Sequence, residues 1–140
     1  MFLFRAPSSR QLGIGLLLLR IAVGIVFMLH GKQKLFDFGF AGVSDAFSHM
    51  GVPMPGVMGP FVALLEFFGG IALILGLLTR LFAFGFTIDM LVAILLVQMK
   101  NGFSHYELEF LLCVSSLALV FMGGGVFSID APLAARKSRV

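Results

Sequence analysis

The chain of 140 residues is long enough for one compact unit and too short for two ordinary domains. Hydrophobic residues make up 59% of it and charged residues 12%, against about 45–50% and about 25% in soluble domains. A soluble fold of this size cannot hide so much apolar surface, so the composition indicates an integral membrane protein. The formal charge of +3 does not predict nucleic-acid binding, because the basic residues lie at the ends of apolar segments.

A helix that spans a bilayer needs about 20 mostly apolar residues. Four segments meet this requirement and predict transmembrane helices over residues 12–36, 57–78, 81–99 and 106–126. Residues 1–29 resemble a signal peptide, but no small-x-small cleavage site follows, so we interpret them as part of the first helix. We therefore predict an all-α polytopic membrane protein, with one domain over residues 1–140 built as a four-helix transmembrane bundle.

The longest connection, residues 37–56, is rich in Gly and Pro. Within it, Ser44 and Asp45 can cap one or two helical turns that end at Gly51. Those turns would present three apolar side chains, Val43, Phe47 and Met50. The pattern predicts a short interfacial helix that lies on the membrane in the first outer loop.

Lys and Arg near the helix ends predict the orientation of the chain. One side carries six of them, Arg5, Arg10, Arg80, Arg136, Lys137 and Arg139, and the other side carries three, Lys32, Lys34 and Lys100. Cytoplasmic loops carry the excess of positive charge. Both termini are therefore predicted to be cytoplasmic, and the long first loop is predicted to face outward.

Three charged residues interrupt the apolar segments near their middles: Arg20, Glu66 and Asp89. An ionised side chain at that depth costs about 2.5–3.5 kcal/mol on insertion scales. At about 100° per residue, each lies on a helix face with other small or polar residues. Lys34 shares the face of Arg20, and Glu109 begins the polar face of the fourth segment. These five residues are our candidate polar cluster inside the bundle.

Several interpretations of this cluster are open. Arg20 and Glu66 could form a structural ion pair that sets the register of two helices. The cluster could instead bind a ligand or proton, because one Arg and two carboxylates leave an excess negative charge. Asp89 could also face lipid or a second copy of the chain. Lys34 could extend its charge to the membrane surface, and Glu109 could complement the positive end of its helix.

No motif for a metal, a cofactor or covalent chemistry accompanies these charges. The three histidines, at positions 30, 49 and 105, are scattered along the chain. Cys113 is the one cysteine, which excludes an internal disulfide and a paired-cysteine redox site. The sequence predicts no metal site and favours a non-catalytic membrane subunit over an enzyme.

A series of short motifs resembles the DoxX family. They span about residues 13–131: Arg20…Phe27…His30-Gly31…Lys34-Leu35, Met50-Gly51-Val52-Pro53, Leu65-Glu66-Phe67-Phe68-Gly69-Gly70, Leu77-Leu78-Thr79-Arg80, and Gly123-Gly124-Gly125 before Ser128 and Asp130. The Glu-x-x-Gly-Gly and Leu-x-Thr-Arg portions are the specific ones. Asp89 departs from the family pattern, which leads us to expect an apolar or aromatic residue there, and Lys32 is additional to it.

The resemblance implies a four-helix protein of the bacterial inner membrane that is associated with a redox system. The related DoxD subunit belongs to a thiosulfate:quinone oxidoreductase, and some DoxX proteins accompany oxidative-stress enzymes. We therefore expect a membrane subunit or anchor of an oxidoreductase or oxidative-stress complex, with a quinone or lipid pocket. The family has no agreed catalytic residues, so none is transferred to this chain.

Two other functions fit the residues. The chain could be an assembly subunit without ligand chemistry, or a carrier of a small solute or of protons, since intramembrane carboxylates and arginines mark such paths. The expected partners are the lipid bilayer, an oxidoreductase subunit and further copies of the chain. No nucleic-acid partner is expected.

Overall fold

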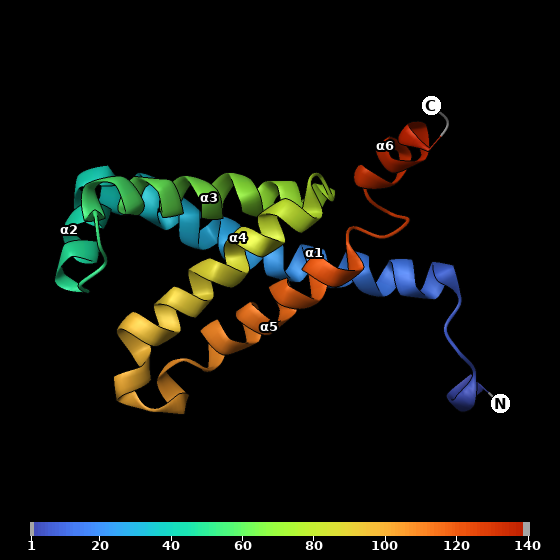
Figure 1. The fold of residues 1–140 in the computed structure, drawn as a ribbon, viewed down its shortest axis with the longest axis horizontal. Coiled ribbons are helices and arrows are strands. Elements are labelled where there is room, and N and C mark those ends of the chain that lie inside the picture. Colours follow the sequence, from blue (N-terminus) through green and yellow to red (C-terminus); the bar gives the residue numbers. More distant parts are fainter. Residues whose placement is uncertain (1, 139–140) are drawn as a thin grey trace.

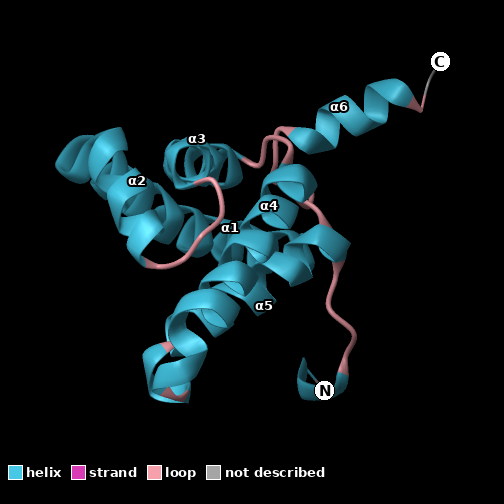
Figure 2. Cartoon of the chain, turned by 60° about the vertical axis from the view of Figure 1, so that its left-hand side comes forward, coloured by secondary structure: helices cyan, strands magenta, loops and turns pink. Residues whose placement is uncertain are grey.

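The computed structural model describes residues 2–138, which form helices and no strand. A short 3-10 turn, η1 (Phe2–Phe4), precedes α1 (Ser9–Lys32). Ser8 begins α1 with a capping box, in which its hydroxyl accepts from the Gln11 backbone N–H and the Gln11 side chain accepts from the Ser8 N–H. Figure 2 shows how little of the chain lies outside helices.

The predicted first loop is mostly helical. α1 continues into a π-helical segment, η2 (Gln33–Phe38), and then into α2 (Gly39–His49). Gly39 has a φ of +71°, which turns the chain between the two helices and suits a residue without a Cβ. α2 ends before Gly51, as expected. The predicted start is wrong, because α2 begins at Gly39 and Ser44 and Asp45 lie inside the helix and do not cap it. Its interfacial position stays a prediction.

α3 (Pro55–Leu75) and α4 (Thr79–Val92) follow, joined by a turn in which Gly76 and Leu78 have left-handed backbone conformations. α4 extends through a π-helical segment, η3 (Ala93–Gln98), and a 3-10 turn, η4 (Met99–Asn101). A second turn, η5 (Phe103–His105), then leads into α5 (Glu107–Met122). The second, third and fourth predicted helices are thus present with ends shifted by a few residues.

The C-terminal segment forms one further helix that the sequence did not lead us to predict. After α5 ends at Met122, Asp130 begins α6 (Asp130–Lys137). The sequence is compatible with a helix start, because an acidic residue favours the first turn and Pro lacks only an N–H that has no helical partner there. α6 extends away from the long helices (Figure 1, Figure 2).

The long helices form two antiparallel pairs, α1 with α3 and α4 with α5 (Figure 1). The pairs meet near the end that holds both termini and diverge toward the end that holds α2 and η3 to η5. A stacked pair of rings, Phe27 on α1 and Phe86 on α4, joins the two pairs with ring centroids 3.8 Å apart. Both rings are fully buried.

Close contact within the first pair depends on glycine. A Cβ on Gly24 of α1 would lie 2.7 Å from the Gly70 carbonyl oxygen, and a Cβ on Gly70 would lie 2.5 Å from the Met28 backbone nitrogen. Side chains at these positions would push α1 and α3 apart. The small residues in the two helices therefore determine how closely the backbones approach.

Three helical stretches within residues 2–138 are long and apolar enough to cross a membrane: residues 9–49, 55–75 and 79–101. α5 has 16 residues, which at about 1.5 Å per residue is about 24 Å, short of the roughly 30 Å hydrocarbon core. The count of four spans therefore stays a prediction. Large apolar side chains are exposed along α1, α3, α4 and α5, as expected for helices that contact lipid.

Candidate functional site

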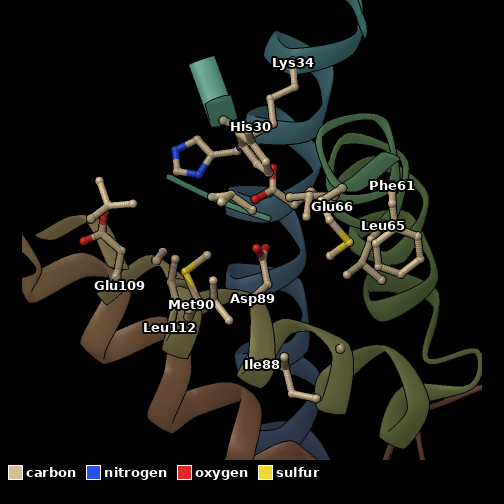
Figure 3. A pocket seen from close by; sticks show the side chains of 18 of the residues that line it. His30, Lys34, Phe61, Leu65, Glu66, Ile88, Asp89, Met90, Glu109 and Leu112 are labelled. Atoms are coloured by element: carbon tan, nitrogen blue, oxygen red, sulfur yellow. The ribbon is translucent and has the colours of Figure 1, made fainter. Parts of the chain in front are cut away.

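The space between the diverging helix pairs contains a cleft of about 670 Å³ (Figure 3). α2 and α3 form one wall, α4 with η3 forms another, and the last turn of α1, η2 and the start of α5 contribute the rest. The lining is mainly apolar, with Phe47, Phe61, Leu65, Phe82, Phe84 and Leu112 among its side chains. The polar residues of the lining come from several elements and are His30, Gln33, Lys34, Glu66, Asp89, Gln98 and Glu109.

The main polar contact in the cleft is an ion pair between η2 and α3. The Lys34 ammonium group lies 2.5 Å from the Glu66 carboxylate. Glu66 is buried, with 3% of its side chain exposed, whereas Lys34 keeps 23%. Lys34 therefore balances the charge of Glu66 and still reaches the cleft with its remaining N–H donors.

Asp89 places a second carboxyl group beside this pair. It projects from α4, and Figure 3 shows it pointing across the cleft toward Glu66. Its Oδ2 atom is buried and has no hydrogen-bond partner among the described residues. A buried polar atom without a partner is costly, and the facing Glu66 carboxyl group supplies a partner when the two groups share one proton.

Two further ionisable residues border the same cleft from other elements. His30 lies one turn before Lys34, and Glu109 projects from the first turn of α5 on the far side (Figure 3). Both are half-buried. The lining thus holds three carboxyl groups, those of Glu66, Asp89 and Glu109, and one ammonium group, that of Lys34.

The predicted ion pair between Arg20 and Glu66 is wrong. Arg20 is fully buried and donates to the carbonyl oxygens of Phe127, at 2.6 Å, and Leu73, at 3.5 Å. Glu66 lies two helical turns from Leu73 along α3, about 10 Å at 1.5 Å per residue. Arg20 thus joins α1 to the C-terminal segment, and it does not line the cleft.

Arg20 lies near a second group of contacts, at the end of the molecule where the two helix pairs meet. Asp130 makes most of these contacts. The Asp130 carboxylate accepts from the backbone N–H groups of Leu78 at 2.7 Å and Thr79 at 2.8 Å, and so caps α4 from a distant part of the chain. In the opposite direction, the Asp130 N–H donates to the Gly76 carbonyl oxygen at 3.0 Å. Two motifs of the sequence, Leu-x-Thr-Arg and the glycine-rich segment that leads to Asp130, therefore hold the start of α4 against the C-terminal segment.

The remaining candidates have local roles. The Cys113 thiol lies 3.6 Å from the Thr87 carbonyl oxygen, between α5 and α4. His49 pairs with Asp45 at 3.6 Å on the exposed surface of α2. Within residues 2–138, no group of His, Cys, Asp and Glu is arranged to hold a metal ion.

Taken together, the apolar exterior, the long helices and the internal cleft define a helical membrane protein with a ligand-sized site between two helix pairs. The chain belongs to the DoxX family, whose pattern it matches over residues 15–99. It is 32% identical over 123 residues to the Bacillus subtilis (strain 168) protein named "Putative oxidoreductase CatD", covering 87% of this chain and 89% of that one. It is 39% identical over 123 residues to the inner membrane protein YqjF of Escherichia coli (strain K12), covering 84% and 90%. No solved structure matches the chain.

Proposed function

We propose that this DoxX-family protein is a membrane subunit or anchor of an oxidoreductase or oxidative-stress complex and holds a quinone-type ring in the cleft. In the bacterial inner membrane, four spans would place both termini in the cytoplasm and the wide end of the cleft toward the outer side. One observation carries the proposal: the cleft joins apolar walls to a polar cluster, Lys34, Glu66 and Asp89.

The size and lining of the cleft fit such a ring. Sites for small molecules measure about 300–1,000 Å³ and are mostly apolar with a few placed polar groups, and this cleft measures about 670 Å³. Phenylalanine rings supply flat apolar walls. A quinone ring needs such walls together with one or two polar partners at its oxygen atoms.

Lipid access supports an apolar ligand. Several lining residues are also exposed on the outer surface, Phe61 on α3 and Phe84 and Ile88 on α4 among them. Apolar side chains at these positions would face lipid in a membrane. A ring with an apolar tail could therefore reach the polar cluster from the bilayer without passing through water.

The redox association rests on the family and on one relative. The name of the Bacillus subtilis relative contains the word oxidoreductase. Within the described residues, no group of His, Cys, Asp and Glu is arranged to hold a metal ion, and Cys113 is the one cysteine of the chain. In this proposal a partner subunit transfers electrons and this chain holds the ring.

A carrier of protons or small solutes is the second candidate, and the core argues against it. Glu66 and Asp89 lie on the cleft side of the stacked Phe27 and Phe86 rings, while Arg20 lies at the narrow end. Val23, Leu73 and Leu119 pack around the same rings. A carrier would need a polar path through this apolar core.

Quinone binding to the purified protein tests the proposal. Short-chain ubiquinone and menaquinone analogues would be titrated in mild detergent, with copurifying lipids and quinones identified by mass spectrometry. Ala93→Phe fills the cleft from η3, and Leu95→Phe, on the same segment, adds a ring outside it. We expect wild type and Leu95→Phe to bind alike and Ala93→Phe to lose binding. Equal binding by all three proteins, or by none, would contradict the proposal.

A further inference from the structure

We propose that Glu66 and Asp89 form a proton-binding site between α3 and α4, and that the proton held there keeps the polar cluster of the cleft uncharged. With the proton bound, the two carboxyl groups carry one negative charge, which Lys34 balances. Without the proton, one negative charge has no partner. The proton site does not depend on the proposed function, whereas its effect on ring binding rests on that function.

The two carboxyl groups lie at the same height on two consecutive helices. Glu66 lies nine residues before the end of α3, and Asp89 lies ten residues after the start of α4. Both are therefore about 14–15 Å from the turn that joins the helices, at about 1.5 Å per residue. Figure 3 shows the two side chains pointing toward each other inside the cleft. The geometry thus brings one carboxyl group from each helix pair together.

The surroundings of the two groups favour one shared proton over two separate charges. Only 3% of the Glu66 side chain is exposed, and the Asp89 Oδ2 atom is buried. Two carboxylates within hydrogen-bonding reach of each other, in a mostly apolar site, cannot both stay ionised at low cost, so one of them keeps a proton. The shared proton also supplies the hydrogen bond that the Asp89 Oδ2 atom otherwise lacks.

Lys34 determines how many protons the site holds. Its ammonium group balances the charge of one carboxylate, so one proton on the pair brings the cluster to no net charge. Loss of this proton would place an uncompensated charge beside the apolar walls of the cleft, which is costly and draws in water. A neutral apolar ring therefore fits the protonated site better than the ionised one.

Two other titratable residues face the cleft, His30 from α1 and Glu109 from α5. The α2 region contributes Phe47, Met50 and Val52, none of which titrates. Histidine titrates near neutral pH, so His30 is the main alternative source of a pH dependence in this cleft. A test of the inference must separate its effect from that of the carboxyl pair.

A small metal cation is the competing occupant of the pair. The Lys34 ammonium group already lies against Glu66, and within residues 2–138 no group of His, Cys, Asp and Glu is arranged to hold a metal ion. Both observations favour a proton. Replacement of sodium by choline in the buffer should therefore leave ring binding unchanged, and a requirement for sodium would overturn the inference.

Infrared spectroscopy of the full chain in mild detergent detects the proton without any ligand. The spectrum of wild type minus that of Asp89→Asn, at about pH 6, should show the carbonyl band of a protonated carboxyl group, shifted in D2O. In wild type alone, this band should disappear between about pH 6 and about pH 9. Glu107→Gln changes an exposed residue outside the cleft and should keep the band. Absence of the band from wild type would overturn the inference, whether or not Asp89→Asn folds.

Ring binding shows what the proton does. A short-chain ubiquinone has no group that titrates in this range, so any pH dependence belongs to the protein. Wild type should bind it about tenfold or more tightly at about pH 6 than at about pH 9, the effect of one buried charge left without a partner. Asp89→Asn carries an amide that donates to Glu66 as the proton does, so it should bind the ring equally at both pH values.

His30→Gln and Glu109→Gln identify the group that titrates. Both variants should keep the wild-type ratio of the two dissociation constants. Loss of the ratio in either variant, or a wild-type ratio in Asp89→Asn, would overturn the inference while leaving ring binding intact. Failure of every protein to bind the ring at either pH, with the infrared band present, would contradict the proposed function and leave the proton site in place.

Discussion

Lys34 on η2 and Glu66 on α3 form the ion pair that connects the end of the first long helix to the polar part of the cleft. The pair determines where the positive charge of the cluster lies. Because Lys34 is the partner of Glu66, Arg20 has other partners and joins α1 to the C-terminal segment. The two basic residues on one helix face thus act at opposite ends of the molecule.

Lys34→Met should destabilise the protein strongly. The change leaves Glu66 and Asp89 facing each other without a cation, and breaking a buried pair from one side costs about 3–5 kcal/mol. We expect the lower end of that range, because Lys34 is 23% exposed. The apparent unfolding temperature in mild detergent measures the effect.

Lys32→Met is the matched control, because Lys32 is exposed two residues earlier in the chain and forms no ion pair among residues 2–138. It should change the unfolding temperature little. Adding Glu66→Gln to Lys34→Met should recover part of the loss, since one of the facing charges is removed. If Lys34→Met and Lys32→Met behave alike, the pair does not hold the helices as described.

Asp130→Ala should destabilise the junction between α3 and α4. The Asp130 carboxylate accepts two backbone N–H groups at the start of α4, and loss of a helix cap costs about 0.5–2 kcal/mol. Asp45→Ala is the control, because Asp45 lies exposed on α2 and makes only a surface contact with His49. Equal loss of stability in the two variants would argue against the cap.

Gly70→Ala and Gly15→Ala should change stability in opposite directions. A Cβ on Gly70 would collide with the backbone of α1, whereas a Cβ on Gly15 meets nothing within 4 Å. Overpacking costs about 1–3 kcal/mol, while Gly→Ala in an open helix position gains up to about 1 kcal/mol. Chemical unfolding in detergent would measure both. Stabilisation of the Gly70 variant would show that the helices are farther apart.

The helices could be predicted from the sequence because each is a long apolar segment with a clear end. Gly51 and Gly123 follow two of them, and both have positive φ. The clustering of polar residues on one face also followed from helical periodicity, which placed Lys34 and Glu66 toward the interior. These features depend on local sequence only.

The partner of Glu66 could not be predicted, because it depends on how far α1 slides along α3. Arg20 and Lys34 share a helix face but lie 14 residues apart, or about 21 Å at 1.5 Å per residue. Only one of them can reach Glu66. The close contact at Gly24 and Gly70 sets the offset between the helices and selects Lys34.

We also did not predict that Asp130 caps the start of α4, although the sequence contains a signal for such a cap. No Ser, Asp or Asn stands just before Thr79, so α4 begins without a local cap. Such a helix start needs an acceptor from elsewhere in the chain, and Asp130 in the motif that closes the chain was a candidate. The cleft itself had no local signal, because it depends on the divergence of two helix pairs.

The last prediction concerns orientation in the membrane. Both termini lie at the same end of the structure, and α2 lies at the opposite end (Figure 1). Basic residues concentrate near the termini, with Arg5, Arg10 and Arg136 among them. The excess of positive charge belongs on the cytoplasmic side. We therefore expect the termini to be inside the cell and the α2 region outside.

Single-cysteine variants in a Cys113→Ala background measure this orientation in intact cells. Phe2→Cys and Ser138→Cys should resist an impermeant thiol reagent, whereas Gly42→Cys, at an exposed position of α2, should react. All three should react after the cells are opened, which controls for the accessibility of each thiol. Labelling of both termini in intact cells, with Gly42→Cys protected, would invert the topology. Labelling of one terminus only would mean an odd number of spans, and α5 would then not cross the bilayer.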